Sequence, residues 1–240
     1  MSALSETLAG LSAIKKALAS SSSDTAGLME EVFFSGANPG GLRMLSYTPE
    51  NLPAKSPLVV VLHGCTQSGA GYASAAGWLT LADRLGFAVL APEQTSNNNP
   101  NRCFNWFEPE DTQRGKGEAA SIHAMITYMI VSRDLDAERV FITGLSAGGA
   151  MTAAMLAAYP ETFAAGAVIA GLPAGAADSV HRAFAVMRAG TEAPMLNLRL
   201  AFDAPARLAL FTRGSPFGTA PRTTLFQTPT RMICSVNGQV

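Results

Sequence analysis

The sequence predicts an α/β fold with a mostly parallel, doubly wound sheet that begins with antiparallel strands. Three observations support it. Residues 139–152 have a strand–turn–helix pattern around Gly144–Gly148. The apolar run 57–62 is typical of a buried parallel strand, and strands alternate with helical segments after it. The chain has 240 residues, which suits one such domain with a sizeable core.

Hydrophobic periodicity and turn residues predict the individual elements. Alternating side chains on both sides of Gly36–Gly41 predict an antiparallel hairpin, and Gly86 is placed to cap a helix. A long polar loop, 92–117, is predicted to be functional because loops of this length are uncommon in compact domains. The predicted elements are strands at 28–35, 42–47, 57–62, 87–91, 140–143 and 163–171, and helices at 71–85, 118–132 and 147–158.

The chain is predicted to have three parts: an N-terminal helix and linker at 1–25, the α/β core at 26–190, and an atypical tail at 191–240. Apolar residues recur at helical spacing between Leu4 and Leu18. Lys15 and Lys16 lie on the wrong side of these residues for a signal peptide, so no Sec-type export signal is expected and the N-terminus favours the cytoplasm.

Composition excludes several classes of function. The formal net charge is −1 without basic or acidic blocks, which argues against nucleic acid or an anionic membrane surface as partner. No apolar run approaches the ~20 residues of a membrane span. No metal cluster, nucleotide loop or dinucleotide fingerprint is visible, so no metal or other cofactor is expected.

Ser146 is the candidate nucleophile. Gly144-Leu145-Ser146-Ala147-Gly148 lies between a predicted strand and a predicted helix, the context of a nucleophile elbow. The turn raises the serine hydroxyl above the sheet edge, and its position at the helix start brings backbone N–H groups near any oxyanion formed there. His63-Gly64, Glu93 and Gly171 also follow predicted strands, at the edge where such sheets bind ligands.

Three motifs carry a resemblance to a known family: Leu-His-Gly-Cys-Thr-Gln at 62–67, Asn-Arg-Cys-Phe-Asn-Trp-Phe at 101–107, and the stretch 139–152. Together they resemble the polyhydroxybutyrate (PHB) depolymerase family of esterases, α/β-hydrolases whose relatives include feruloyl and acetylxylan esterases. The resemblance covers roughly residues 30–190.

The resemblance implies Ser146 as nucleophile and an oxyanion hole formed by the backbone N–H groups of Cys65 and Ala147. It also implies a Cys65–Cys103 disulfide, which would pin the long loop over the site and fit export. Two free buried thiols are the alternative. Phe104 and Trp106 would then form a substrate wall, although core packing explains Trp106 equally well.

The sequence pattern does not show the acid and the histidine of a catalytic triad. The resemblance implies a strand ending in His-Gly-x-x-Asp and a late Gly-His, and neither is present. His63 belongs to the oxyanion loop, and His123 lies within a predicted helix. His181 with Asp178 has the right chain order but comes early, on a predicted helix. Asp203 is a candidate acid without a histidine to orient.

Composition changes in the tail. From Ala204 to Val240 there is no acid, lysine or histidine, and the charged residues are Arg207, Arg213, Arg222 and Arg231. We therefore hypothesise that the last ~45 residues are out of frame or replaced, so that the regular final strands are absent, with poor solubility as the corollary.

The first functional hypothesis is a serine esterase that hydrolyses poly- or oligo-hydroxyalkanoates or short-chain esters through an acyl-enzyme on Ser146. Its partner would be an ester substrate, polymeric or small, and the family implies an extracellular location. The alternative is an impaired or inactive hydrolase that lacks the triad histidine and retains a binding cleft. A peptidase on the same scaffold would share the serine, but the loop motif favours esters.

Overall fold

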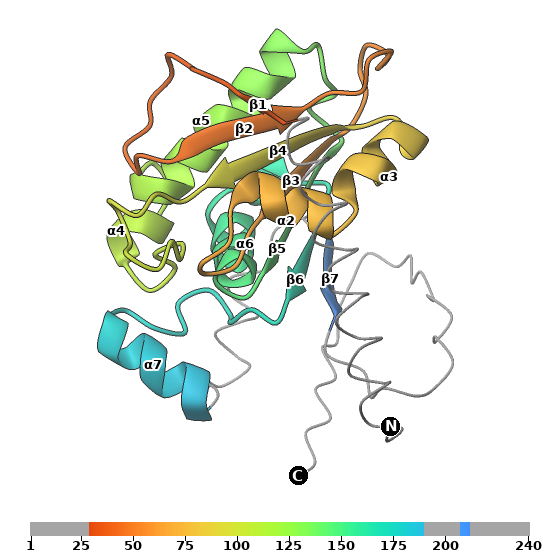
Figure 1. Cartoon of the computed structure of the whole chain (residues 1–240). Coiled ribbons are helices and arrows are strands. Elements are labelled where there is room, and N and C mark those ends of the chain that lie inside the picture. The colour runs from red at the N-terminus through yellow and green to blue at the C-terminus, as the bar shows by residue number, and fades with distance from the viewer. Residues whose placement is uncertain (1–28, 190–206, 212–240) are drawn as a thin grey trace, which may run out of the picture.

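The computed structural model describes residues 29–189 and 207–211. They form a seven-stranded sheet in the order β1-β2-β4-β3-β5-β6-β7 (Figure 1). β1 and β2 are antiparallel to their neighbours, and the other strands are parallel. The strands are β1 Glu30–Glu31, β2 Arg43–Tyr47, β3 Leu58–Leu62, β4 Ala88–Glu93, β5 Val140–Leu145, β6 Ala165–Ile169 and β7 Arg207–Phe211. The predicted mixed α/β sheet with an antiparallel start is confirmed.

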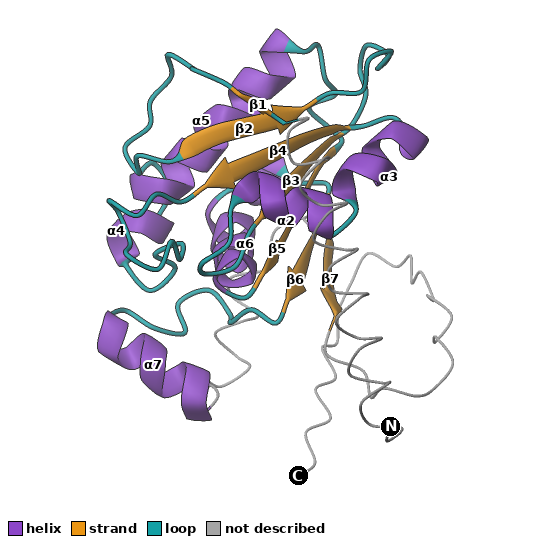
Figure 2. Cartoon of the chain, viewed as in Figure 1, coloured by secondary structure: helices purple, strands orange, loops and turns teal. Residues whose placement is uncertain are grey.

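Helices cover both faces of the sheet (Figure 2). The helical elements are α2 Gly69–Ala75, α3 Trp78–Leu85, α4 Pro109–Thr112, α5 Gly117–Ser132, α6 Ala147–Ala158, the 3₁₀ turn η1 Pro160–Thr162, and α7 Val180–Ala189. Alternate residues of β3 face opposite layers because side chains in a strand alternate. Leu58 and Val60 contact the α5–α6 layer, whereas Val59 and Val61 contact the α2–α3 layer.

The predicted single helix over 71–85 is wrong in one respect. It is two helices, because Gly77 adopts φ 80, a left-handed conformation that ends one helix and begins the next. Gly86, at φ 71, caps α3 as predicted, and its N–H donates to the Ala82 carbonyl.

β7 corrects the expectation that no regular strand follows β6. It pairs in parallel with β6, from Ala165 opposite Arg207 to Ile169 opposite Phe211. The expectation rested on the charge composition of the whole tail, whereas a run as short as Leu-Ala-Leu-Phe at 208–211 is sufficient for a short strand. The predicted N-terminal helix, Asp203 and most of the atypical tail lie outside the described residues.

Candidate active site

Ser146 lies between β5 and α6 in a backbone conformation that favours glycine. Its φ is 56° and its ψ is −116°. Its N–H donates to the carbonyl oxygen of Ile169, at the end of β6, over 2.9 Å. Such conformations cost ~1–3 kcal/mol and persist where the surroundings impose them, often at functional sites. The serine is exposed and lines a pocket at the carboxyl edge of the sheet.

Glycines around the turn allow this conformation because neighbouring backbones come into contact there. A Cβ at Gly148 would overlap the carbonyl oxygens of Leu62 and His63. A Cβ at Gly144 would overlap the carbonyl of Gly148. The two glycines therefore let the start of α6 lie directly against the end of β3, which brings Ser146 beside the 63–67 loop.

Two backbone N–H groups beside Ser146 have no acceptor within residues 29–189 and 207–211. Ala147 is the first residue of α6, so its N–H has no partner within the helix. The N–H of Cys65 has no hydrogen-bond acceptor among the described residues. Both residues line the same pocket as Ser146. This arrangement offers two donors to a carbonyl oxygen held over the serine.

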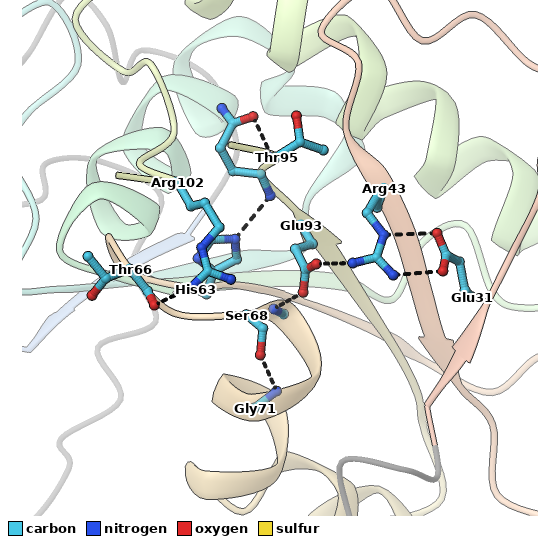
Figure 3. A network of polar contacts seen from close by, with 11 residues as sticks. Glu31, Arg43, His63, Thr66, Ser68, Gly71, Glu93, Thr95 and Arg102 are labelled. Atoms are coloured by element: carbon cyan, nitrogen blue, oxygen red, sulfur yellow. Dashed lines mark hydrogen bonds and ion pairs between the residues drawn. The ribbon is translucent and has the colours of Figure 1, made fainter. Parts of the chain in front are cut away.

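The long loop is fixed to the 63–67 loop at several points. A disulfide joins Cys65 to Cys103, the pair that the resemblance implies. The N–H of Thr66 donates to the Asn101 carbonyl over 2.7 Å. Arg102 Nη2 donates to the Thr66 carbonyl over 2.8 Å, a bond that Figure 3 shows with Arg102 in front of the His63 ring. These contacts hold Thr66 and Arg102 at φ 64 and φ 50.

The pocket has a volume of about 620 Å³ and a mainly apolar lining. One wall comes from the long loop, including Trp106 and Phe107, and another from α7. The structure does not support Phe104 as part of the wall: it is fully buried in the core, with its ring centroid 4.9 Å from that of His63. Phe104 packs in the α5–α6 layer of the core, whereas Trp106, two residues later, packs with Ala147 and Ala183 beside the pocket. The pocket lining comprises Cys65, Thr66, Asn99, Pro100, Asn101, Cys103, Trp106, Phe107, Ser146, Ala147, Ala150, Ala170, Gly171, Leu172, Val180, Ala183, Phe184 and Met187.

A buried carboxyl group, that of Glu118, binds two residues of the long loop 92–117. Glu118, at the start of α5, is 1% exposed and accepts hydrogen bonds from Gln94 Nε2 and, over 2.9 Å, from the N–H of Asn105. Burial and the nearby Asp111 raise the pKa of Glu118 to about 8, although the two hydrogen bonds oppose that shift. The sequence did not indicate this role, because a glutamate in the first turn of a helix is ordinarily a surface residue.

The three histidines of the chain all lie in the described residues, and none is hydrogen-bonded to Ser146. Both ring nitrogens of the buried His63 are engaged: Nδ1 donates to the Gly64 carbonyl and Nε2 accepts from the N–H of Gln94. Burial lowers the pKa of His63. His123 stacks on Tyr159 at 4.2 Å, and burial lowers its pKa too. His181 lies exposed on α7 and does not line the pocket.

Of the two candidate acids, Asp203 lies outside the described residues, and Asp178 is not brought to Ser146. Asp178 precedes α7 and accepts from Ser179 Oγ over 3.4 Å, with no described contact to His181. Glu93 is buried and binds Arg43 and the N–H of Gly69 (Figure 3). It therefore joins β4 to β2 and to the start of α2. The described residues thus bring Ser146 and two unpaired N–H groups into one pocket, and no described histidine or carboxylate is hydrogen-bonded to the serine.

Residues 44–207 match the model of the family described as "Esterase PHB depolymerase". The chain belongs to this family. Poly(3-hydroxyalkanoate) depolymerase C of Paucimonas lemoignei is 49% identical over 175 residues, which are 73% of this chain and 42% of that protein. A probable acetylxylan esterase A of Aspergillus fumigatus is 37% identical over 152 residues, 63% of this chain and 40% of that protein. The structure of an acetyl xylan esterase from Aspergillus awamori superimposes with a TM-score of 0.67 at 29% identity, covering 76% of this chain and 70% of that one.

The chain spans less than half the length of the two sequence relatives that it matches. Within the part that the structure describes, no helix is both long and apolar enough to cross a bilayer. The same residues contain no group of three or more His, Cys, Asp or Glu side chains placed to bind a metal ion.

Proposed function

We propose that this chain is a serine esterase that takes the acyl group of a carboxylic ester onto Ser146. The observation that carries the proposal is the position of Ser146: a strained turn, beside two unpaired N–H groups, in an apolar pocket. The serine Oγ attacks the ester carbonyl carbon and its proton passes through solvent to the departing alkoxide, while the N–H groups of Cys65 and Ala147 stabilise the oxyanion. The alcohol leaves, and water then hydrolyses the acyl-enzyme.

The lining of the pocket favours esters with an apolar acyl or hydroxyacyl chain. Trp106, Phe107, Leu172, Phe184 and Met187 line it, and none of the described lining residues is an ionisable carboxylate, a lysine or an arginine. Hydroxyalkanoate oligomers and short-chain esters fit this lining better than a charged or strongly polar acyl group would. We further propose an extracellular location, which is supported by the Cys65–Cys103 disulfide because disulfides persist in oxidising compartments.

A second candidate function is favoured by the placement of the histidines. Because none contacts Ser146, the chain would be an impaired hydrolase that accepts an acyl group slowly and releases it more slowly still. A triad-deficient serine hydrolase retains roughly 10³–10⁴-fold catalysis over water from its oxyanion hole and substrate binding. The same pocket would then act chiefly as an ester-binding site.

Two measurements on purified protein separate these candidates: fluorophosphonate labelling and p-nitrophenyl butyrate hydrolysis, each with Ser146→Ala as the control. Labelling and multiple turnovers that both disappear in Ser146→Ala would support the esterase. Labelling or a single acylation without turnover would support the impaired hydrolase. A folded protein that neither labels nor hydrolyses would overturn both.

A further inference from the structure

The peptide group between Gly64 and Cys65 carries one of the two oxyanion donors, and its orientation is fixed from its carbonyl side. The Gly64 carbonyl accepts from His63 Nδ1 over 2.8 Å and from the N–H of Gln67 over 3.3 Å. His63 must carry its proton on Nδ1, because Nε2 accepts from the N–H of Gln94 over 3.1 Å. A trans peptide is planar with its C=O and N–H opposed, and the described residues contain no cis peptide. Holding the carbonyl inward therefore directs the Cys65 N–H outward into the pocket.

The side chain of Gln67 holds the preceding peptide group as well. The N–H of Gly64 donates to Gln67 Oε1 over 2.7 Å. Gly64 leaves room for this contact: a Cβ there would lie 3.1 Å from Gln67 Oε1 and 3.6 Å from Ser146 Cβ. Gln67 thus contacts Gly64 on both of its peptide groups, through its side chain on one and its backbone on the other.

We propose that Gln67 is a positioning residue for the oxyanion hole, an inference that rests on the proposed function. Glycine is the residue whose backbone rotates most freely, so a Gly64 held on one side alone could rotate its peptide away from Ser146. The Oε1 contact removes that freedom. Gln67 itself does not line the pocket, so its effect on the reaction passes through the direction of the Cys65 N–H.

The test needs a nucleophile that requires no base. Ser146→Cys supplies a thiol that ionises near pH 8 without help, and Cys234→Ser in every variant leaves it as the single free thiol. p-Nitrophenyl butyrate acylates this thiolate through a tetrahedral oxyanion, forming a thioester and releasing p-nitrophenolate. Iodoacetamide alkylates the same thiolate by direct displacement of iodide, with no oxyanion. The ratio of the two rates, followed by mass spectrometry, reports the oxyanion hole alone.

Gln67→Met keeps the bulk of the side chain and removes the acceptor. Loss of one oxyanion donor lowers rates by ~10²–10³, so a donor that is misdirected in about nine-tenths of the molecules should lower the acylation-to-alkylation ratio by about 10-fold. Gln113→Met, the same change at an exposed position on the far side of the loop, is the matched control and should leave the ratio unchanged. Thermal unfolding of each variant verifies that it is folded.

Each outcome decides a different question. A lower ratio in Gln67→Met with unchanged alkylation supports the proposal. An unchanged ratio in a folded Gln67→Met overturns it and leaves the proposed esterase intact. If the thiol is alkylated but not acylated even with Gln67 present, the oxyanion hole does not operate, and the proposed function falls together with the inference.

Discussion

Replacing Ser146 with glycine should stabilise the protein relative to replacing it with alanine. Ser146 has φ 56° and ψ −116°, where a Cβ is unfavourable and glycine is not. Neither substitution removes a buried contact, since the serine is exposed and no hydrogen bond is described for its hydroxyl. The difference between the two variants therefore isolates the backbone strain.

The expected size follows from two opposing contributions. Strain of this kind costs ~1–3 kcal/mol. Glycine offsets ~0.5–1 kcal/mol of this gain, because it makes the unfolded chain more flexible and so raises the entropy that is lost on folding. The free energy of unfolding of Ser146→Gly should therefore exceed that of Ser146→Ala by about 0.5–2 kcal/mol, which is a rise in Tm of about 2–4 °C per kcal/mol for a chain of this size.

Urea and thermal unfolding of both variants give the measurement. Ala157→Gly, within α6, is the control: there the same loss of a Cβ should cost about 1 kcal/mol. Equal or lower stability of Ser146→Gly compared with Ser146→Ala would refute the argument that the turn stores strain.

Three further predictions test the surroundings of the site. Cys65→Ser with Cys103→Ser opens a loop with a sequence separation of 38 and should lower the free energy of unfolding by about 3–4 kcal/mol; an unchanged urea midpoint would contradict this. The pKa of Glu118 is raised to about 8 in the fold, so between pH ~4.5 and 8 the folded state binds a proton that the unfolded state does not. The stability that this protonation contributes is therefore fully present below pH ~4.5 and is lost as the pH rises to about 8. Urea unfolding at pH 5 and pH 8 should show this loss, and Glu118→Gln should reduce the difference between the two pH values; an equal difference in both proteins would exclude Glu118 as the cause. Gly148→Ala should cost about 3 kcal/mol, because the new Cβ meets the Leu62 carbonyl and not a flexible side chain; near-native stability would mean that α6 can shift away from β3.

The sequence was most informative where function depends on a short contiguous stretch. The elbow around Ser146 needs a strand, a tight turn and a helix in succession, and small residues where backbones meet; all of these are visible within 139–152. The parallel strands were equally visible because their buried runs, such as 57–62, are continuous. Boundaries were less certain: the break at Gly77 depends on one left-handed residue in an otherwise helical pattern.

The sequence was least informative where function depends on which way a side chain faces. Phe104 and Trp106 are two residues apart in a loop without regular periodicity, and both are buried, but Trp106 also lines the pocket and Phe104 does not. The sequence also did not indicate the contact between Gln67 and Gly64, although Gln67 ends the 62–67 motif. Its contact with Gly64, three residues earlier, is local and could have been anticipated from the glycine, whose freedom has to be restrained by some partner.

The contacts that hold Ser146 and the N–H of Cys65 in place do not depend on a triad base. Gly144 and Gly148 make room for the turn at Ser146, Gln67 binds the N–H of Gly64, and the disulfide holds Cys65. All of these contacts come from β3, β5, α6 and the long loop, whereas the acid and histidine of an α/β-hydrolase follow later in the chain. A change in the sequence after β6 can therefore remove the groups that transfer the proton and leave the arrangement of Ser146 and the Cys65 N–H intact. If the chain is the impaired hydrolase, we accordingly expect it to form an acyl-enzyme faster than it hydrolyses one, so that fluorophosphonate labelling and a single acylation are seen without turnover.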